Sequence, residues 1–183
     1  MEKRDTYGVD IAGVHRELTL FEIKPGLRIA ILNILGDIEL VQACARELAK
    51  KLKNTPCDIL VTAETKSIPL AYALAVEMKK PYVVFRKSYK PYMGKALRTE
   101  TLSITTGEPQ TLILDEKDLE LIKGKNIVIV DDVISTGSTL QGMRLLTDKA
   151  GGNISAEAAI FTEGERAKWR EIVSLGHLPV FTD

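Results

Sequence analysis

Two adjacent carboxylates and a loop of small hydroxylated residues follow one apolar stretch of this chain. The stretch is I-V-I-V at residues 127–130, the acids are Asp131 and Asp132, and the loop is S-T-G-S-T at 135–139. Such a loop, leading into a helix, offers an anion backbone N–H groups, hydroxyls and the positive end of the helix dipole. It therefore predicts a phosphate cradle. The acids suit the hydroxyls of a sugar or a Mg²⁺ ion held through water, so a sugar phosphate satisfies both halves of the motif.

This loop differs from the common nucleotide-binding loops. It has no lysine of the P-loop type, and its glycine does not fit G-x-G-x-x-G. An ordinary helix-capping loop beside solvated acids is the structural alternative. A single acid before S-T-G would leave that alternative strong, whereas the full pattern of strand, acid pair, two-residue spacer and loop favours the phosphate site.

Two other apolar stretches also end in residues that suit an anion. Thr65, Lys66 and Ser67 follow residues 58–63, and a cluster of cations follows residues 81–85. Ligands of open α/β sheets bind beyond the carboxyl ends of the strands, so all three strand ends are expected to share one edge. The cluster consists of Arg86, Lys87 and Lys90. The simpler alternatives to a binding role are a solvated loop position for Lys66 and an ordinary surface position for the cluster.

Strands and helices alternate along the chain, and the strands are rich in Val and Ile. This is typical of the α/β class, with a mostly parallel twisted sheet flanked by helices. The amphipathic stretch 36–52, with Asp37 as its cap, is the clearest helix. No repeat or linker divides residues 1–183, so a single domain is expected. The expected strands are 58–63, 81–86, 111–114, 126–131 and 154–161, the other helices are 68–79, 116–123 and 139–150, and an N-terminal hairpin occupies 7–21.

The composition restricts the partners. Lys plus Arg and Asp plus Glu both number 25 in 183 residues, so no net field attracts nucleic acid or an acidic membrane. The N-terminus has no apolar core of a signal peptide, and no segment approaches the ~18 apolar residues of a membrane span. A cytoplasmic protein with no nucleic-acid or membrane partner is expected. Cys44 and Cys57 lack metal-type spacing and are expected to be buried in a reducing compartment.

Residues 127–139 resemble the phosphoribosyl pyrophosphate signature of the type I phosphoribosyltransferases, in which an apolar strand, two acids and a small-residue loop end in T-G-x-T. A-E-T-K-S at 63–67 matches the position of that family's pyrophosphate loop. F-R-K-S-Y-K-P-Y at 85–92 resembles the R-K-x-x-K-P element of adenine and xanthine phosphoribosyltransferases. The resemblance implies the type I phosphoribosyltransferase fold, with a small hood from the N- and C-terminal segments and a flexible lid loop at about 87–110.

The resemblance also implies a role for each of these residues. Some of the pyrophosphate-binding residues are expected to reach in from a partner subunit. The implied sets are Asp131 and Asp132 for the ribose hydroxyls, catalysis and a substrate-carried Mg²⁺; Ser135, Thr136, Gly137, Ser138 and Thr139 for the 5-phosphate; and Thr65, Lys66, Ser67, Arg86, Lys87 and Lys90 for the pyrophosphate.

The reaction of that family calls for a lid. Displacing pyrophosphate from ribose C1 builds positive charge on the sugar, and water must be kept from this carbon. The long polar segment 93–110 predicts the lid, with a disordered insertion as the alternative. Adenine phosphoribosyltransferases carry a catalytic Glu in an E-Y-G-x-D stretch of the lid, and Glu100 is only a loose counterpart. Phe161 is a candidate to stack on the base, although a core position is more frequent for a Phe at a strand end.

The implied activity is Mg²⁺-dependent transfer of ribose 5-phosphate from phosphoribosyl pyrophosphate to a purine base in purine salvage, by a homodimer. Adenine is slightly favoured over xanthine or hypoxanthine/guanine on overall resemblance. The alternatives are a regulatory or catalytically silent protein that binds the sugar phosphate. Purine-operon repressors of this kind carry an extra DNA-binding domain, for which 183 residues are expected to leave no room.

Overall fold

Five parallel strands form the central sheet, in the order β10-β9-β8-β4-β5. The computed structural model describes residues 5–102 and 109–182. Strands buried on both faces are expected to be continuously apolar, and the middle of this sheet is rich in Val, Ile and Ala. The strands are β4 (Ile59–Ala63), β5 (Tyr82–Phe85), β8 (Asn126–Ile134), β9 (Asn153–Glu163) and β10 (Val173–Leu178).

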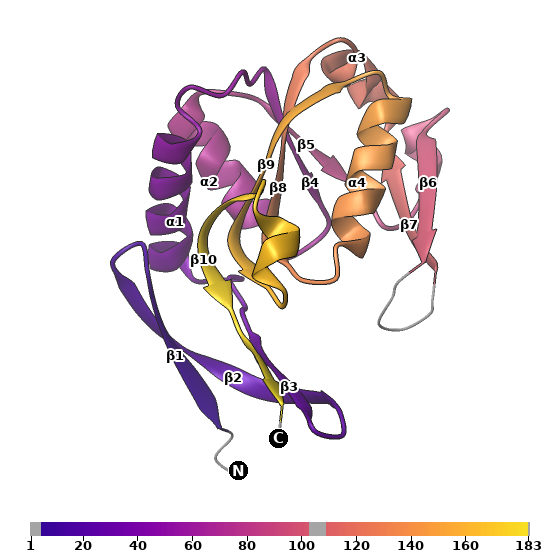
Figure 1. Ribbon diagram of the computed structural model, residues 1–183. Helices are drawn as coiled ribbons and strands as arrows, with labels where there is room; N and C mark the ends of the chain where they lie inside the picture. The colour runs from indigo at the N-terminus through magenta and orange to yellow at the C-terminus, as the bar shows by residue number, and fades with distance from the viewer. Residues whose placement is uncertain (1–4, 103–108, 183) are drawn as a thin grey trace.

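Helices cover both faces of this sheet (Figure 1). Side chains alternate along β8, so Val128 and Val130 join the core under α1 and α2, whereas Ile127 and Ile129 join the core under α4. The expected α/β class is thereby confirmed. The helices are α1 (Ile38–Lys51), α2 (Ile68–Met78), the short α3 (Leu119–Ile122) and α4 (Ser138–Lys149). Within the described residues, none of them is long and apolar enough to cross a bilayer.

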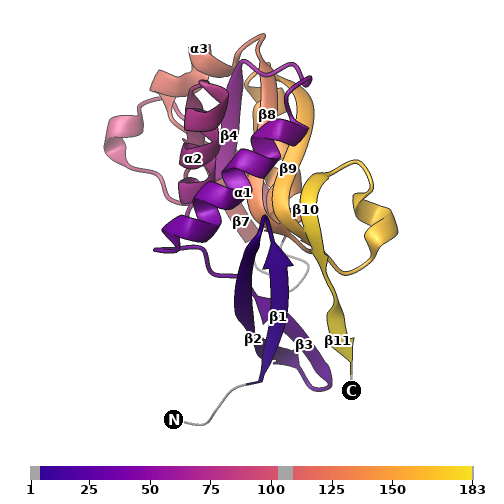
Figure 2. The ribbon, with the colours of Figure 1, turned by 90° about the vertical axis from the view of Figure 1, so that its left-hand side faces the viewer.

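A second sheet, which we call the hood, lies beyond one edge of the central sheet (Figures 1 and 2). Its four strands are antiparallel, in the order β1-β2-β3-β11, and they come from the N- and C-terminal segments. The residue pattern predicted the first hairpin but neither β3 nor β11. The strands are β1 (Thr6–Ile11), β2 (Val14–Lys24), β3 (Leu27–Ile31) and β11 (Val180–Thr182).

The cap of α1 joins the hood to the central layer. The Asp37 carboxylate accepts a hydrogen bond from the Leu40 N–H at 3.1 Å, as the sequence predicts for a cap. Arg16 of β2 donates to the same carboxylate at 2.7 Å. The hydrogen bond from Arg16 lowers the pKa of Asp37, so the cap is charged at neutral pH.

The polar stretch 87–110 contains more regular structure than the sequence indicates. A short 3₁₀ helix, η1 (Pro91–Met93), precedes β6 (Leu97–Leu102), which pairs antiparallel with β7 (Pro109–Leu114). The expected strand 111–114 therefore belongs to this separate hairpin and not to the parallel sheet. The hairpin packs on α4, and the backbones of Arg86 and Ile113 join it to the end of β5 with two 2.8 Å hydrogen bonds. Of the expected lid, residues 103–108 lie outside the described part of the chain.

Candidate active site

A cavity of about 300 Å³ lies between the carboxyl edge of the central sheet and the hood. The ends of β4, β8 and β9 form one side, and β3 forms the other. This is the edge at which ligands of parallel sheets bind. The residues after β4 and β8 meet there as expected, and Lys87 joins them from the segment after β5. The polar residues that line the cavity are Glu64, Thr65, Lys66, Ser67, Lys87, Asp131, Asp132, Ser135, Thr139 and Glu163.

The acid pair lies deeper than the sequence indicates. The sequence predicts a strand that ends at residue 131, but β8 continues to Ile134, and only 8% of Asp131 and 6% of Asp132 are exposed. The Asp132 N–H donates to Asp131 Oδ1 at 2.9 Å. Burial, and then the neighbouring charge of Asp132, raise the pKa of Asp131. Both acids are buried because the hood covers this end of the strand.

One carboxylate oxygen of the pair has no hydrogen-bond partner. Asp132 Oδ2 is buried and accepts no hydrogen bond within the described residues. Lys66 Nζ lies 3.3 Å away, close enough for charge attraction, and it donates a hydrogen bond to the Leu32 carbonyl at 3.1 Å. A buried oxygen that accepts no hydrogen bond is costly. It is therefore a natural acceptor for the hydroxyl of a sugar or for a cation carried by a ligand.

The loop 135–139 encloses a smaller hollow of about 110 Å³ next to the acid pair. Gly137 has a φ of +86° and directly precedes the first turn of α4. The Thr136 and Ser138 hydroxyls are 2.9 Å apart, so they hold each other at the mouth of the helix. Backbone N–H groups at the start of a helix and a set of hydroxyls favour a phosphate here, as the sequence predicts.

The loop after β4 approaches the acid pair from the other side. The Ser67 hydroxyl interacts with Asp131 and also donates to the Ala63 carbonyl at 3.3 Å. The Glu64–Thr65 peptide bond is cis. Thr65, Lys66 and Ser67 therefore share the cavity with the acid pair, as we expected for a pyrophosphate loop.

The cationic cluster is divided by the fold. Lys87 lines the cavity, whereas Arg86 and Lys90 do not. Arg86 donates from Nε to Glu64 Oε1 at 2.6 Å, and the Lys87 N–H donates to Glu64 Oε2 at 2.8 Å. Glu64 thus neutralises Arg86 within the chain, and Lys90 is exposed beside η1.

Two other predicted site residues lie away from the cavity. Glu100 is exposed on β6, and its neighbour Thr101 faces α4 with its hydroxyl 3.5 Å from the Ser138 carbonyl. Glu100 therefore points to the opposite side of the hairpin. Phe161 is 3% exposed, and its ring packs against Gly176 and Ile11. This packing corresponds to the core alternative, and stacking of Phe161 on a base stays a prediction.

The structure adds residues from the C-terminal part that the sequence analysis did not select. Glu163 ends β9 and accepts a hydrogen bond from the Ser135 hydroxyl at 2.5 Å. In the 3₁₀ helix η3 (Arg166–Trp169), Lys168 Nζ donates to the Thr136 carbonyl at 3.0 Å and the Trp169 ring packs on Gly137. The signal in the sequence that could have indicated Glu163 is its position at a strand end, two residues after the apolar run that ends at Phe161.

The residues suit a metal that a substrate carries better than a metal bound by protein alone. In residues 5–102 and 109–182, no three His, Cys, Asp or Glu side chains are placed to hold an ion together. The acid pair offers two carboxylates, and Asp132 Oδ2 accepts no hydrogen bond within the described residues. Magnesium keeps several waters and often binds through one or two carboxylates plus substrate phosphates, so this set fits it.

Comparisons with known proteins agree with this geometry. The family model described as the phosphoribosyl transferase domain matches residues 32–172. The adenine phosphoribosyltransferase of Petrotoga mobilis is 30% identical over 174 residues, which cover 91% of this chain and 96% of that protein. The purine biosynthesis transcriptional repressor PurR of Bacillus subtilis is 30% identical over 143 residues, 78% of this chain and 49% of the repressor. The chain spans about half the length of the PurR regulators that it matches.

The fold is also shared with solved structures. The adenine phosphoribosyltransferase of Thermoanaerobacter pseudethanolicus has a TM-score of 0.69 at 22% identity, over 87% of this chain and 95% of that one. This likeness confirms the type I phosphoribosyltransferase fold. The family model covers most of the sequence, and the acid pair and the loops 65–67 and 135–139 meet at one cavity. The chain therefore belongs to the phosphoribosyl transferase domain family.

Proposed function

We propose that this protein is a Mg²⁺-dependent purine phosphoribosyltransferase of purine salvage. It transfers ribose 5-phosphate from phosphoribosyl pyrophosphate to a purine base, and adenine is the favoured base. The observation that carries the proposal is the convergence of three binding elements on one cavity, namely the acid pair, the loop 135–139 and the loop 65–67. Adenine is favoured because an adenine phosphoribosyltransferase is similar over nearly the full length of both chains.

In this proposal, each part of the substrate binds a different element of the cavity. The 5-phosphate binds the loop 135–139, and the ribose hydroxyls bind Asp131 and Asp132. The pyrophosphate binds the loop 65–67 with Lys87, whose charges stabilise the leaving group as the C1–O bond breaks. Mg²⁺ bound with the substrate at the acid pair would further neutralise the pyrophosphate. The hood strand β3 closes the other side of the cavity and helps to exclude water.

Incubation with phosphoribosyl pyrophosphate and Mg²⁺ tests this proposal, with adenine, xanthine, hypoxanthine and guanine supplied one at a time. Chromatography should show a nucleoside monophosphate and pyrophosphate in equal amounts. The double variant Asp131→Asn/Asp132→Asn should lose transfer by at least ~100-fold while its melting curve stays cooperative, because it removes the ribose contacts but not the core. The absence of nucleotide with all four bases would exclude this function.

A second candidate is a regulatory protein that binds phosphoribosyl pyrophosphate without catalysis. The similarity to the PurR regulators favours it, because it extends over 78% of this chain. Such a protein would bind phosphoribosyl pyrophosphate in calorimetry and form no nucleotide. Binding and transfer measured on the same preparation therefore separate the two candidates.

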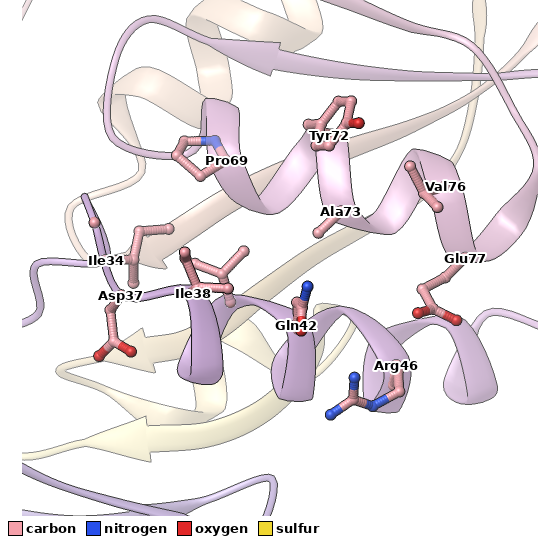
Figure 3. A pocket seen from close by; sticks show the side chains of 12 residues that line it. Ile34, Asp37, Ile38, Gln42, Arg46, Pro69, Tyr72, Ala73, Val76 and Glu77 are labelled. Carbon is pink, nitrogen blue, oxygen red and sulfur yellow. The ribbon is translucent and has the colours of Figure 1, made fainter.

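We also infer that the protein is a cytoplasmic homodimer that associates through a groove between α1 and α2 (Figure 3). The groove measures about 470 Å³, and its walls carry Ile38, Tyr72 and Val76, with 71%, 58% and 58% of their surfaces exposed. Large exposed apolar side chains that lie together indicate an interface. A second copy fits as the occupant because Arg46 and Glu77 both line the groove, so two copies related by a twofold axis can pair these charges.

A further inference from the structure

Glu163 is a buried carboxyl in the cavity for which the proposed substrate contacts have no role. It ends β9, and only 4% of its surface is exposed. Within the described part of the chain, Ser135 is the one side chain that hydrogen-bonds it, and this bond occupies Oε1. The other oxygen, Oε2, is left to accept a hydrogen bond from a ligand. Trp169 holds the backbone in place, since its Nε1 donates to the Glu163 carbonyl at 3.0 Å.

The sheet order places this carboxyl opposite the pyrophosphate loop. The strands β4 and β9 pair with β8 on its two sides, so the loop 65–67 and Glu163 flank the acid pair from opposite directions. Ile134 of β8 pairs with Thr162 of β9, which puts Glu163 level with Ser135. An acceptor that approaches C1 from the side opposite the leaving group therefore arrives on the side of Glu163.

The surroundings of Glu163 favour its protonated form. Burial raises its pKa, and the Ser135 hydroxyl and the charge of His177 oppose this rise. A carboxylate with a raised pKa binds a proton more strongly than an ordinary one, which makes it a better base. The other titratable or charged groups that share its cavity or flank its loop are Glu64, Lys66, Lys87, Asp131 and Asp132 in the cavity, His177 on β10 and Lys168 on η3.

We propose that Glu163 is the general base of the transfer reaction, accepting the proton from the ring N–H of the incoming purine on Oε2 while Ser135 holds Oε1. The inference rests on the proposed function. As the base nitrogen bonds to C1, the C1–O bond to pyrophosphate breaks and its electron pair leaves with the pyrophosphate. The N–H electron pair stays on the base, and its proton moves to the Glu163 carboxylate. Glu163 then returns the proton to water after the products leave.

The test is steady-state transfer by Glu163→Gln, with Glu165→Gln as the matched control. Gln has the same shape and still accepts from Ser135, but it cannot take a proton. Glu165 is two positions away and exposed, so its variant loses an equal charge outside the cavity. We expect kcat of Glu163→Gln to fall by ~100-fold or more, the usual share of a general base, with unchanged affinity for phosphoribosyl pyrophosphate in calorimetry. Glu165→Gln should match the wild type.

Two readouts separate proton transfer from a merely structural role. At saturating substrates, wild-type kcat should fall as the pH drops below the raised pKa of Glu163, and Glu163→Gln should lack this limb. Under these conditions Asp131 is bound to the ribose, so its ionisation affects the pH profiles of the wild type and of Glu163→Gln equally. The loss in kcat should also be smaller for an 8-azapurine, because its ring N–H is more acidic and needs the base less. Glu163→Asp, which keeps a carboxyl, should retain the limb at a reduced rate.

The outcomes distinguish this inference from the function on which it rests. If the wild type transfers but Glu163→Gln keeps its rate and its pH limb, the inference is wrong and the proposed function stands. Loss of phosphoribosyl pyrophosphate binding in Glu163→Gln would also overturn it, since Glu163 would then only hold Ser135. If Glu163→Gln fails to fold, a Glu163→Asp variant that lacks the acid limb overturns it instead. If the wild type forms no nucleotide with any base, both ideas fail together.

Discussion

At the scale of single residues, the buried carboxylates of the site destabilise the free protein, and a bound ligand would relieve this cost. Two carboxylates are buried side by side, and one of their oxygens has no hydrogen-bond partner among the described residues. Both features cost stability in the free protein. A sugar diol or a substrate-bound cation would relieve this cost, so the arrangement favours ligand binding at the expense of the free fold.

This view predicts that Asp131→Asn stabilises the free protein in a pH-dependent way. The folded-state pKa of Asp131 lies above the unfolded value of about 3.9, so wild-type stability falls as the pH rises from about 4 through the raised pKa. Asn cannot ionise and escapes this loss. The melting temperature of the variant should therefore exceed that of the wild type by at least ~2 °C at pH 8, with a smaller difference at pH 4. Asp148→Asn, at an exposed position on α4, is the control. An equal difference at both pH values would show that ionisation of Asp131 does not oppose folding.

A second prediction concerns Gly137, where a side chain meets two obstacles. Its φ of +86° disfavours a Cβ, and an added Cβ would lie 2.6 Å from Trp169 Cη2. Gly164 has the same φ but open space, so Gly164→Ala isolates the backbone cost of about 1 kcal/mol. Gly137→Ala should lose more stability than this. It should also weaken ribose 5-phosphate binding at least ~10-fold, because Trp169 and the loop 135–139 must move apart. Equal stability losses in the two variants, with unchanged binding of ribose 5-phosphate to Gly137→Ala in calorimetry, would show that neither Gly137 nor its contact with Trp169 shapes the loop 135–139.

The residues of the site could be predicted only where their chemistry is local. Asp131 and the loop 135–139 follow each other in sequence, so their type and spacing were enough. The strand-end position of Glu163 is visible in the sequence, but its contact with Ser135 depends on β9 lying beside β8, a contact between distant segments. The engagement of Arg86 by Glu64 was hidden for the same reason, since the two residues are 22 positions apart.

At the scale of elements, the β6–β7 hairpin supports the loop 135–139 through α4. The first turn of α4 carries that loop, and β6 and β7 lie against the same helix. This contact could not be predicted, because the polar and Pro-containing segment 87–110 is typical of a loop. Strand β6 gains its partners only when β7 and α4 are in place. The strands β3 and β11 were missed in the same way, since the hood is completed by segments from both chain ends.

The contact between α4 and the hairpin depends on the lack of a side chain at Gly142. A Cβ there would lie 3.0 Å from Leu112 Cδ1 and 3.5 Å from Thr101 Oγ1. Gly142→Val should therefore destabilise the protein by ~1–3 kcal/mol, as overpacking does. Gln141→Val is the control, because Gln141 is exposed on the same helix and pays only the propensity difference. Denaturant unfolding measures both, and equal midpoints for the two variants would show that the hairpin can move away freely.

At the scale of the whole molecule, the cavity lies where the two sheets meet. Lys66 crosses the gap by donating to the Leu32 carbonyl, and Arg16 crosses it by pairing with Asp37. The hood is therefore fastened to the central layer at two points. The groove between α1 and α2 begins at this junction. Ile34, which follows β3, and Pro69, which follows the loop 65–67, both line the groove. A partner seated in the groove would stand beside the site.

The homodimer can be tested through Val76, which lies on the wall of this groove. Val76→Glu puts a charge into an apolar contact but leaves the fold of the single chain alone, since 58% of the side chain is exposed. In sedimentation equilibrium the wild type should show twice the chain mass of 20.2 kDa, and the variant should show the chain mass. Leu145→Glu is the matched control, because Leu145 is an exposed apolar residue on α4 and should leave the dimer intact. A wild type with the mass of one chain, or a Val76→Glu variant that still pairs, would rule out this groove as the interface. Transfer by the monomeric variant then shows whether one chain holds the complete site: full kcat means that Arg86 and Lys90 are not needed across the interface.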